Sequence, residues 1–121
     1  MKILIIGNGI QGKKRILNLN KKIKYKVFDL YLKSDYQKFE LINLDNFDAV
    51  FLCTPDVYKF YYIELFLKKK IPVLVEKPLF FDDDQLNYLY KLSKKNKTVC
   101  YTAYNHRFEP SFLLLKKKLE D

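Results

Sequence analysis

Short apolar runs alternate along the chain with longer segments in which apolar residues recur at helical spacing. The first run, residues 3–6, is uninterrupted and mostly β-branched, which is typical of a strand buried on both faces of a parallel sheet. Further runs predict four more strands, at 25–29, 48–53, 72–75 and 98–102. Strands that alternate with helices are joined by right-handed crossovers, so the pattern predicts an α/β fold with a doubly wound parallel sheet.

The segments around these strands predict four helices. Their expected ranges are 13–20, 56–70, 82–95 and 111–120. Asp82 and Gln85 have the spacing of a capping box at the start of the third helix, and Pro110 precedes the fourth. The second helix is apolar nearly all round, so part of its surface is a candidate interface. At 34–46 the pattern is weaker and predicts a short helical turn followed by an edge strand at 39–42.

Three glycines, Gly7, Gly9 and Gly12, follow the first strand in the spacing G-x-G-x-x-G. In a dinucleotide-binding turn the first glycine permits the tight turn and the second lets the backbone approach a pyrophosphate. The third lets the next helix pack closely against the strand. The N-terminus of that helix offers unpaired N–H groups to phosphate. The motif predicts a phosphate-binding turn in a Rossmann-like, three-layer α/β/α fold. A glycine-rich turn that binds nothing is the alternative.

The second predicted strand ends in an acidic residue, Asp29, which lies 17 positions after Gly12. A carboxylate about 20 residues beyond the glycines binds the ribose hydroxyls of NAD and repels the 2′-phosphate of NADP. We therefore expect NAD, while NADP stays open because Lys33 lies nearby. An aspartate that only caps a turn is the alternative interpretation.

Two other strand ends carry distinctive residues, Thr54 and Pro55 after the third strand and Glu76 and Lys77 after the fourth. Ligands of a doubly wound sheet bind beyond the carboxyl ends of its strands. Lys77 is the candidate for proton chemistry, because an ammonium beside a nicotinamide can hold a substrate hydroxyl and share its proton. Glu76 would orient Lys77 or bind the nicotinamide side. The alternative is an ordinary surface lysine, and the Lys77–Pro78 bond is a candidate cis peptide.

The fifth strand is followed by the segment 104–108, which holds the chain's one histidine, His106. This histidine either serves a substrate or caps a loop. Arg107 pairs either with an anionic ligand or with a carboxylate such as Glu109. One histidine and two distant cysteines do not form a metal site, so no metal is expected.

Length and composition exclude several classes of protein. The 121 residues suit a single domain, and the net charge of +9 is spread over lysines near expected helix ends. This distribution argues against a nucleic-acid surface. Cys53 and Cys100 are expected to be buried free thiols, which suit a reducing cytoplasm. No apolar stretch is long enough for a membrane span and no signal-peptide pattern is present, so we expect a soluble, cytoplasmic protein without membrane partners.

Four motifs, in order G-N-G-I-Q-G, C-T-P-D, V-L-V-E-K-P-L and A-Y-N-H-R-F-E-P, resemble the N-terminal half of the Gfo/Idh/MocA oxidoreductases. The resemblance implies a Rossmann domain that binds NAD or NADP, in a dehydrogenase acting on a sugar, cyclitol, sugar nucleotide or similar polyol. It implies that Lys77 is the catalytic lysine and that Asn105, His106 and Arg107 lie on the substrate side. The cofactor contacts that it implies are Gly7, Gly9, Ile10, Gln11, Gly12, Asp29, Thr54, Pro55, Glu76 and Lys77.

The chain departs from the family pattern in three ways. Lys59 stands five residues after Thr54, where members often carry a histidine, and Ala103 stands where a glycine commonly precedes Tyr104. The resemblance implies that the family's second half supplies most substrate contacts and the oligomer interface. That half is missing from the 121 residues. We therefore expect a single cofactor-binding domain, residues 1–121, present as a truncation, a gene fragment or an excised piece, with weak or no turnover alone.

Two other functions remain open at this point. A stand-alone nucleotide- or CoA-binding Rossmann sensor would explain the short length, but not why Glu76-Lys77-Pro78 is retained. An interaction protein would instead pair through the aromatic helix at 56–70. In the favoured hypothesis the partners are the dinucleotide and, only if a second domain is supplied, a small polyol or sugar; assembly with a second copy of the chain is open.

Overall fold

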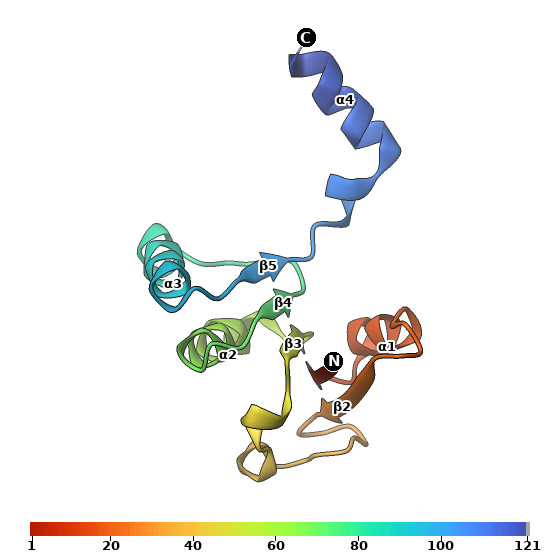
Figure 1. The fold of residues 1–121 in the computed structure, drawn as a ribbon, viewed down its shortest axis with the longest axis vertical. Helices are drawn as coiled ribbons and strands as arrows, with labels where there is room; N and C mark the ends of the chain where they lie inside the picture. Colours follow the sequence, from red (N-terminus) through yellow and green to blue (C-terminus); the bar gives the residue numbers. More distant parts are fainter. Residues whose placement is uncertain (121) are drawn as a thin grey trace.

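The computed structural model describes residues 1–120 and contains one sheet of five parallel strands, in the order β2-β1-β3-β4-β5 (Figure 1). Helices α2 and α3 cover one face of the sheet, and α1 covers the other. The doubly wound, Rossmann-like fold predicted from the sequence is thereby confirmed. The strands are β1 (Lys2–Ile6), β2 (Lys24–Phe28), β3 (Ala49–Leu52), β4 (Val73–Val75) and β5 (Cys100–Thr102). The helices are α1 (Ile10–Leu17), α2 (Asp56–Lys68), α3 (Asp83–Asn96) and α4 (Pro110–Glu120).

Strand β1 lies at the centre of the core, as its uninterrupted apolar run predicts. Leu4 and Ile6 point to the α2 side, whereas Ile3 and Ile5 point to the α1 side, and none of the four is more than 2% exposed. Successive side chains of a strand alternate between the two faces, so a strand covered on both faces must be apolar at every position.

Helix α1 begins earlier than expected, at Ile10 rather than after Gly12. Gly12 therefore lies within the first turn of the helix, directly against the backbone of the preceding turn. A Cβ atom at Gly12 would lie 2.0 Å from the carbonyl oxygen of Gly7. The missing side chain is what lets α1 start this close to the end of β1.

The edge strand expected at 39–42 is not formed. Residues 34–46 instead contain two short 3₁₀ turns, η1 (Phe39–Leu41) and η2 (Leu44–Asn46), and this segment pairs with β2 through a single bridge between Tyr36 and Phe28. Phe39 and Ile42 are three residues apart, a spacing that places both side chains on one side of a 3₁₀ turn. Both pack against the core, which an alternating strand could not achieve.

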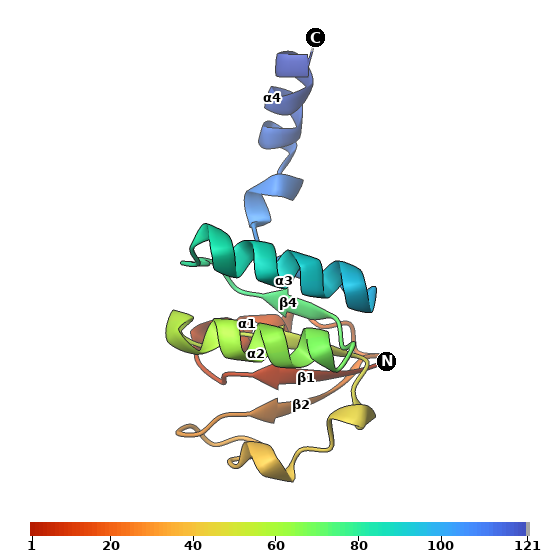
Figure 2. The ribbon, with the colours of Figure 1, turned by 90° about the vertical axis from the view of Figure 1, so that its left-hand side faces the viewer.

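The apolar surface of α2 is largely explained by packing on two sides. Ile63 and Phe66 face the sheet, while Phe60 lies edge-on to Phe81 at 5.6 Å and contacts Tyr88 of α3. Figure 2 shows the two helices side by side across the sheet. Val57 remains 81% exposed. Whether this remainder is an interface, as the sequence suggested, stays a prediction.

Helix α4 projects from the body of the domain and packs beside the 3₁₀ turn η3 (Asn105–Phe108) (Figures 1 and 2). Four of its five large apolar side chains are about half exposed. Within residues 1–120, no helix combines the length and apolar character needed to cross a membrane.

The predicted capping box of α3 is present and supports a stability prediction. The Asp82 carboxylate accepts from the N–H of Gln85 at 2.8 Å, and the Gln85 side chain accepts from the N–H of Asp82 at 3.2 Å. Asp82→Ala leaves a first-turn N–H without its partner, so we expect a loss of about 1 kcal/mol in the free energy of unfolding, measured by urea titration. Asp84→Ala, in the first turn of the same helix, is the control. Equal losses in both variants would show that the negative charge at the N-terminus of α3, not the cap, is responsible.

Candidate functional site

The glycine turn between β1 and α1 forms an open cradle at the carboxyl edge of the sheet. Gly7 has a φ of +100°, and a Cβ there would lie 2.6 Å from the carbonyl oxygen of Cys53. Gly9 caps α1, and apart from Gly9 itself and its two chain neighbours no residue has an atom within 4 Å of where its Cβ would be. The first turn of α1 carries no acidic side chain, so its N–H groups are free to attract an anion.

Asp29 ties this turn to the loop after β2. Its carboxylate accepts from the N–H of Asn8 at 2.7 Å, and from those of Tyr31 and Leu32 at 2.8 Å each. Partial burial by itself raises the pKa of Asp29, but the hydrogen bonds from Asn8, Leu32 and Tyr31 outweigh it and hold the pKa below its ordinary value. The aspartate does close a turn, as one interpretation held, and it also lines a cavity.

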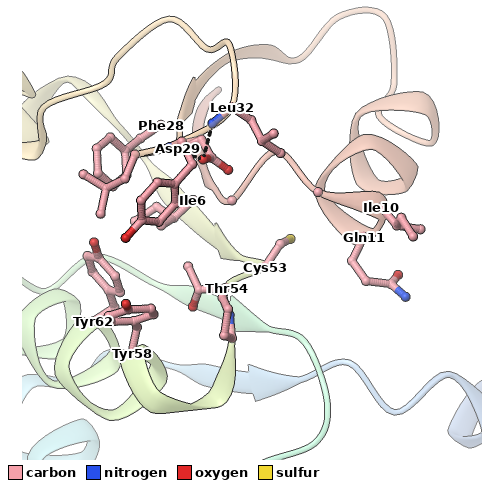
Figure 3. A pocket seen from close by; sticks show the side chains of 15 residues that line it. Ile6, Ile10, Gln11, Phe28, Asp29, Leu32, Cys53, Thr54, Tyr58 and Tyr62 are labelled. Atoms are coloured by element: carbon pink, nitrogen blue, oxygen red, sulfur yellow. Dashed lines mark hydrogen bonds between the residues drawn. The ribbon is translucent and has the colours of Figure 1, made fainter.

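That cavity has a volume of about 600 Å³ and lies beyond the carboxyl ends of β1, β2 and β3. In a sheet of this strand order the switch point lies between β1 and β3, where ligands of such folds bind. Figure 3 shows Phe28 and Asp29 on one wall, Tyr58 and Tyr62 of α2 on the opposite wall, and Ile10 and Gln11 of α1 at one end. The other lining residues are Ile6, Gly7, Gly9, Leu30, Tyr31, Leu32, Cys53, Thr54 and Pro55.

The end of β3 contributes an unusual polar group to the cavity. The hydroxyl oxygen of Thr54 is buried and has no hydrogen-bond partner in the described part of the chain. Beside it, burial raises the pKa of the Cys53 thiol to about 12, so this side chain is a neutral thiol at ordinary pH. An orphaned hydroxyl and an open glycine cradle on one cavity fit a dinucleotide, which would supply the missing partner.

The turn after β4 carries Glu76, Lys77 and Pro78. Glu76 is buried and accepts a hydrogen bond from the Nε–H of Arg15 on α1. Lys77 is exposed, and the Lys77–Pro78 bond is cis, as its position after a strand suggested. On the other face of the sheet, Lys59 donates to the carbonyl oxygen of Pro78 at 2.6 Å.

A second hollow of about 530 Å³ lies beside the ends of β4 and β5. Of the three substrate-side candidates, Asn105 and Arg107 line this hollow. His106 does not; its ring contacts Glu109 at 2.9 Å and lies against Phe112. Glu109 therefore pairs with His106. The pairing of Glu109 with Arg107, which was one of the two alternatives for that arginine, is not the one observed. Arg15 also lines the hollow.

No group of three metal-ligating side chains occurs within residues 1–120. Both cysteines are free, and each is partly rather than fully buried. Burial raises the pKa of Cys100 to about 11.

Sequence reasoning missed the aromatic wall of the cavity and the two cations at the Glu76–Pro78 turn. Tyr58 and Tyr62 are four residues apart on a helix that is apolar nearly all round, so periodicity alone does not assign them to a ligand. Arg15 carried a signal, since it is one of two arginines and follows Gly12 by one helical turn.

The sequence is similar to those of known oxidoreductases. Inositol 2-dehydrogenase of Rhizobium meliloti is 30% identical over 74 residues, which are 61% of this chain and 22% of that protein. The uncharacterized oxidoreductase YrbE of Bacillus subtilis is 28% identical over 91 residues, 75% of this chain and 26% of that protein. Thus the matches span about a quarter of the length of these curated relatives.

Solved structures show the same fold. A putative myo-inositol dehydrogenase from Sinorhizobium meliloti superposes with a TM-score of 0.81 at 22% identity, covering 100% of this chain and 41% of that one. A probable dehydrogenase from Thermotoga maritima gives a TM-score of 0.80 at 24% identity, covering 99% and 41%.

A family model matches residues 24–104, which include Asp29 and the Glu76–Pro78 turn, and it is described as the oxidoreductase family with an NAD-binding Rossmann fold. The glycine turn precedes the matched residues and has the geometry that such a domain needs. The chain belongs to the Gfo/Idh/MocA oxidoreductase family, of which it contains the NAD-binding domain.

Proposed function

We propose that residues 1–121 bind NAD(H) in the 600 Å³ cavity and present Lys77 to the reacting end of the cofactor. The whole reaction is hydride transfer between the nicotinamide and a hydroxyl-bearing carbon of a cyclitol, sugar or sugar nucleotide. The observation that carries the proposal is that one cavity joins the glycine cradle, the Asp29 carboxylate and the unpartnered hydroxyl of Thr54.

The phosphates of the cofactor are bound by the N-terminus of α1. The N–H groups of Ile10, Gln11 and Gly12 belong to the first turn, and such groups lack partners within a helix. The space above Gly9 lets phosphate oxygens approach the backbone. The hydroxyl group of Thr54 donates a hydrogen bond to the same ligand.

Asp29 selects the ribose. A carboxylate offers about four lone-pair sites, and three N–H groups already use three of them. One site remains for a ribose hydroxyl. Because the pKa of Asp29 is lowered, the group is ionised at neutral pH and repels a 2′-phosphate. The aromatic walls, Tyr58 and Tyr62, offer ring faces for the adenine to stack on.

The catalytic end is formed by the turn after β4. When bound, the nicotinamide accepts or gives hydride. Lys77, exposed at the carboxyl edge, holds the substrate hydroxyl and moves its proton. Asn105 and Arg107 offer polar groups in the hollow next to this turn. A cyclitol is the favoured substrate class, because a curated relative is named inositol 2-dehydrogenase. Substrate binding needs a second domain, so the 121 residues alone turn over little or nothing.

Calorimetric titration with NADH and with NADPH tests the cofactor assignment. We expect NADH to bind and to bind about tenfold more tightly than NADPH, a difference of about 1.4 kcal/mol from one charge repulsion. Lys33→Met should leave NADH affinity unchanged. Tighter binding of NADPH would contradict the role of Asp29 and would show that Lys33 determines the preference between NADH and NADPH.

The same titration with AMP and CoA separates the second candidate function. A cavity with aromatic walls and a phosphate cradle admits any adenine nucleotide, so a sensor would bind one of these better than NADH. No binding of any dinucleotide at millimolar concentration would overturn the proposal.

A further inference from the structure

Lys59 is among the largest fully buried side chains of the described residues, and it is charged. It lies one turn into α2 and is 2% exposed. Its ammonium donates to the carboxylate of Asp56 at 2.5 Å and to the carbonyl oxygen of Pro78 at 2.6 Å. A buried ammonium is costly unless it is paired, and an apolar side chain of similar size would fill the same space more favourably.

The contact with Pro78 gives this buried charge a consequence outside its own helix. Pro78 directly follows Lys77, so the ammonium of Lys59 holds the backbone one residue beyond the candidate catalytic lysine. On the near side, Glu76 is held by Arg15 of α1. The turn that carries Lys77 is therefore held by two cations, Arg15 of α1 on one face of the sheet and Lys59 of α2 on the other. Lys77 itself is exposed.

Loops that are not tied to the body of a protein move on the nanosecond timescale, which blurs the position of any group that they carry. Catalysis by a lysine requires the amine to stay within hydrogen-bond reach of the reacting oxygen. We propose that Lys59 is a positioning residue: it acts through the Pro78 carbonyl to fix the direction in which Lys77 leaves the turn. This inference rests on the proposed function for the role of Lys77, but the contact that it invokes does not.

The variant that tests it is Lys59→Met, which keeps the length of the side chain and removes the donor. We expect the ¹⁵N order parameters of the Lys77 and Leu79 amides to fall from about 0.85 to below about 0.6. Residues of β1 and α3 should keep their order. Lys59→His, which retains one N–H donor, should restore the order of the turn. Lys68→Met is the matched control, because Lys68 is on the same helix and pairs at the surface with Glu64.

A second readout uses bound NADH. In the wild-type chain we expect a nuclear Overhauser contact between the Lys77 side chain and the C4 protons of the nicotinamide. This contact should be lost in Lys59→Met while the NADH affinity stays within about threefold, since the cradle at Gly9 is untouched. If wild-type protein binds no NADH, the proposed function fails, and the order parameters still decide the role of Lys59.

Three results would overturn the inference. Unchanged order at Lys77 in Lys59→Met would show that the turn does not need the ammonium. Loss of order throughout β1 and α3 would show that Lys59 is a general structural residue. If Lys59→Met does not fold, the wild-type chain decides the question. An order parameter of the Lys77 amide already below about 0.6 in the wild type would show that the contact between Lys59 and Pro78 does not hold the turn.

Discussion

Gly12→Ala is expected to destabilise the chain by about 3 kcal/mol or more, whereas Gly9→Ala should cost less than about 1 kcal/mol and weaken cofactor binding by at least about tenfold. The Cβ added at Gly12 would lie 2.0 Å from the carbonyl oxygen of Gly7, so α1 would have to move away from β1. At Gly9, with a φ of −74°, the added Cβ would have no atom within 4 Å from any residue other than Gly9 and its two chain neighbours. The methyl group would point into space that the proposal gives to phosphate oxygens.

Urea unfolding measures the first effect, and titration with NADH measures the second. The affinity of Gly9→Ala should fall by at least about tenfold. Gly9→Ala that still binds NADH normally would place the phosphates elsewhere. A stable Gly12→Ala would mean that α1 can shift without cost, which would contradict the tight packing of this turn.

Arg15→Met is expected to cost about 3 kcal/mol in the free energy of unfolding. Glu76 is 9% exposed and its carboxylate accepts from Arg15, so the substitution leaves a buried charge without its partner. Because Arg15 is partly exposed, the expected loss of stability lies at the lower end of the range for breaking a buried ion pair. Lys13→Met, on the exposed side of the same helix, should cost less than about 0.5 kcal/mol.

A double-mutant cycle separates the ion pair from other effects. Arg15→Met combined with Glu76→Gln should recover part of the stability lost in Arg15→Met, because the second change removes the stranded charge. Additive losses in the cycle would show that the two side chains contribute independently. The pair would then not couple the phosphate-binding helix to the strand that precedes Lys77.

The sequence predicted the parts of the fold that depend on local pattern. The run at 3–6 specified β1, and the Asp82–Gln85 pair specified the start of α3, because both signals act over a few residues. The segment at 39–42 was predicted wrongly. The conformation of Phe39 and Ile42 is set by packing in one cluster with the aromatic and aliphatic side chains of α2, which lie far away in sequence.

The candidate site divides in the same way. The glycines and Asp29 were found because their chemistry follows from spacing along the chain. Tyr58, Lys59 and Arg15 were not assigned to the site, since each gains its role from a partner that the fold brings near. The pairing of Arg15 with Glu76 spans 61 positions, and nothing local to either residue indicates it.

The aromatic wall of the cavity also belongs to the hydrophobic core. Tyr62 lines the cavity, and its ring lies 5.4 Å from that of Phe39 and 6.2 Å from that of Phe66, which is fully buried. Phe28 likewise joins the cavity to Phe39. A ligand that packs against these rings therefore adds to the core itself. Occupancy and folding are thermodynamically linked here, so the melting temperature of the chain should report on how full the cavity is.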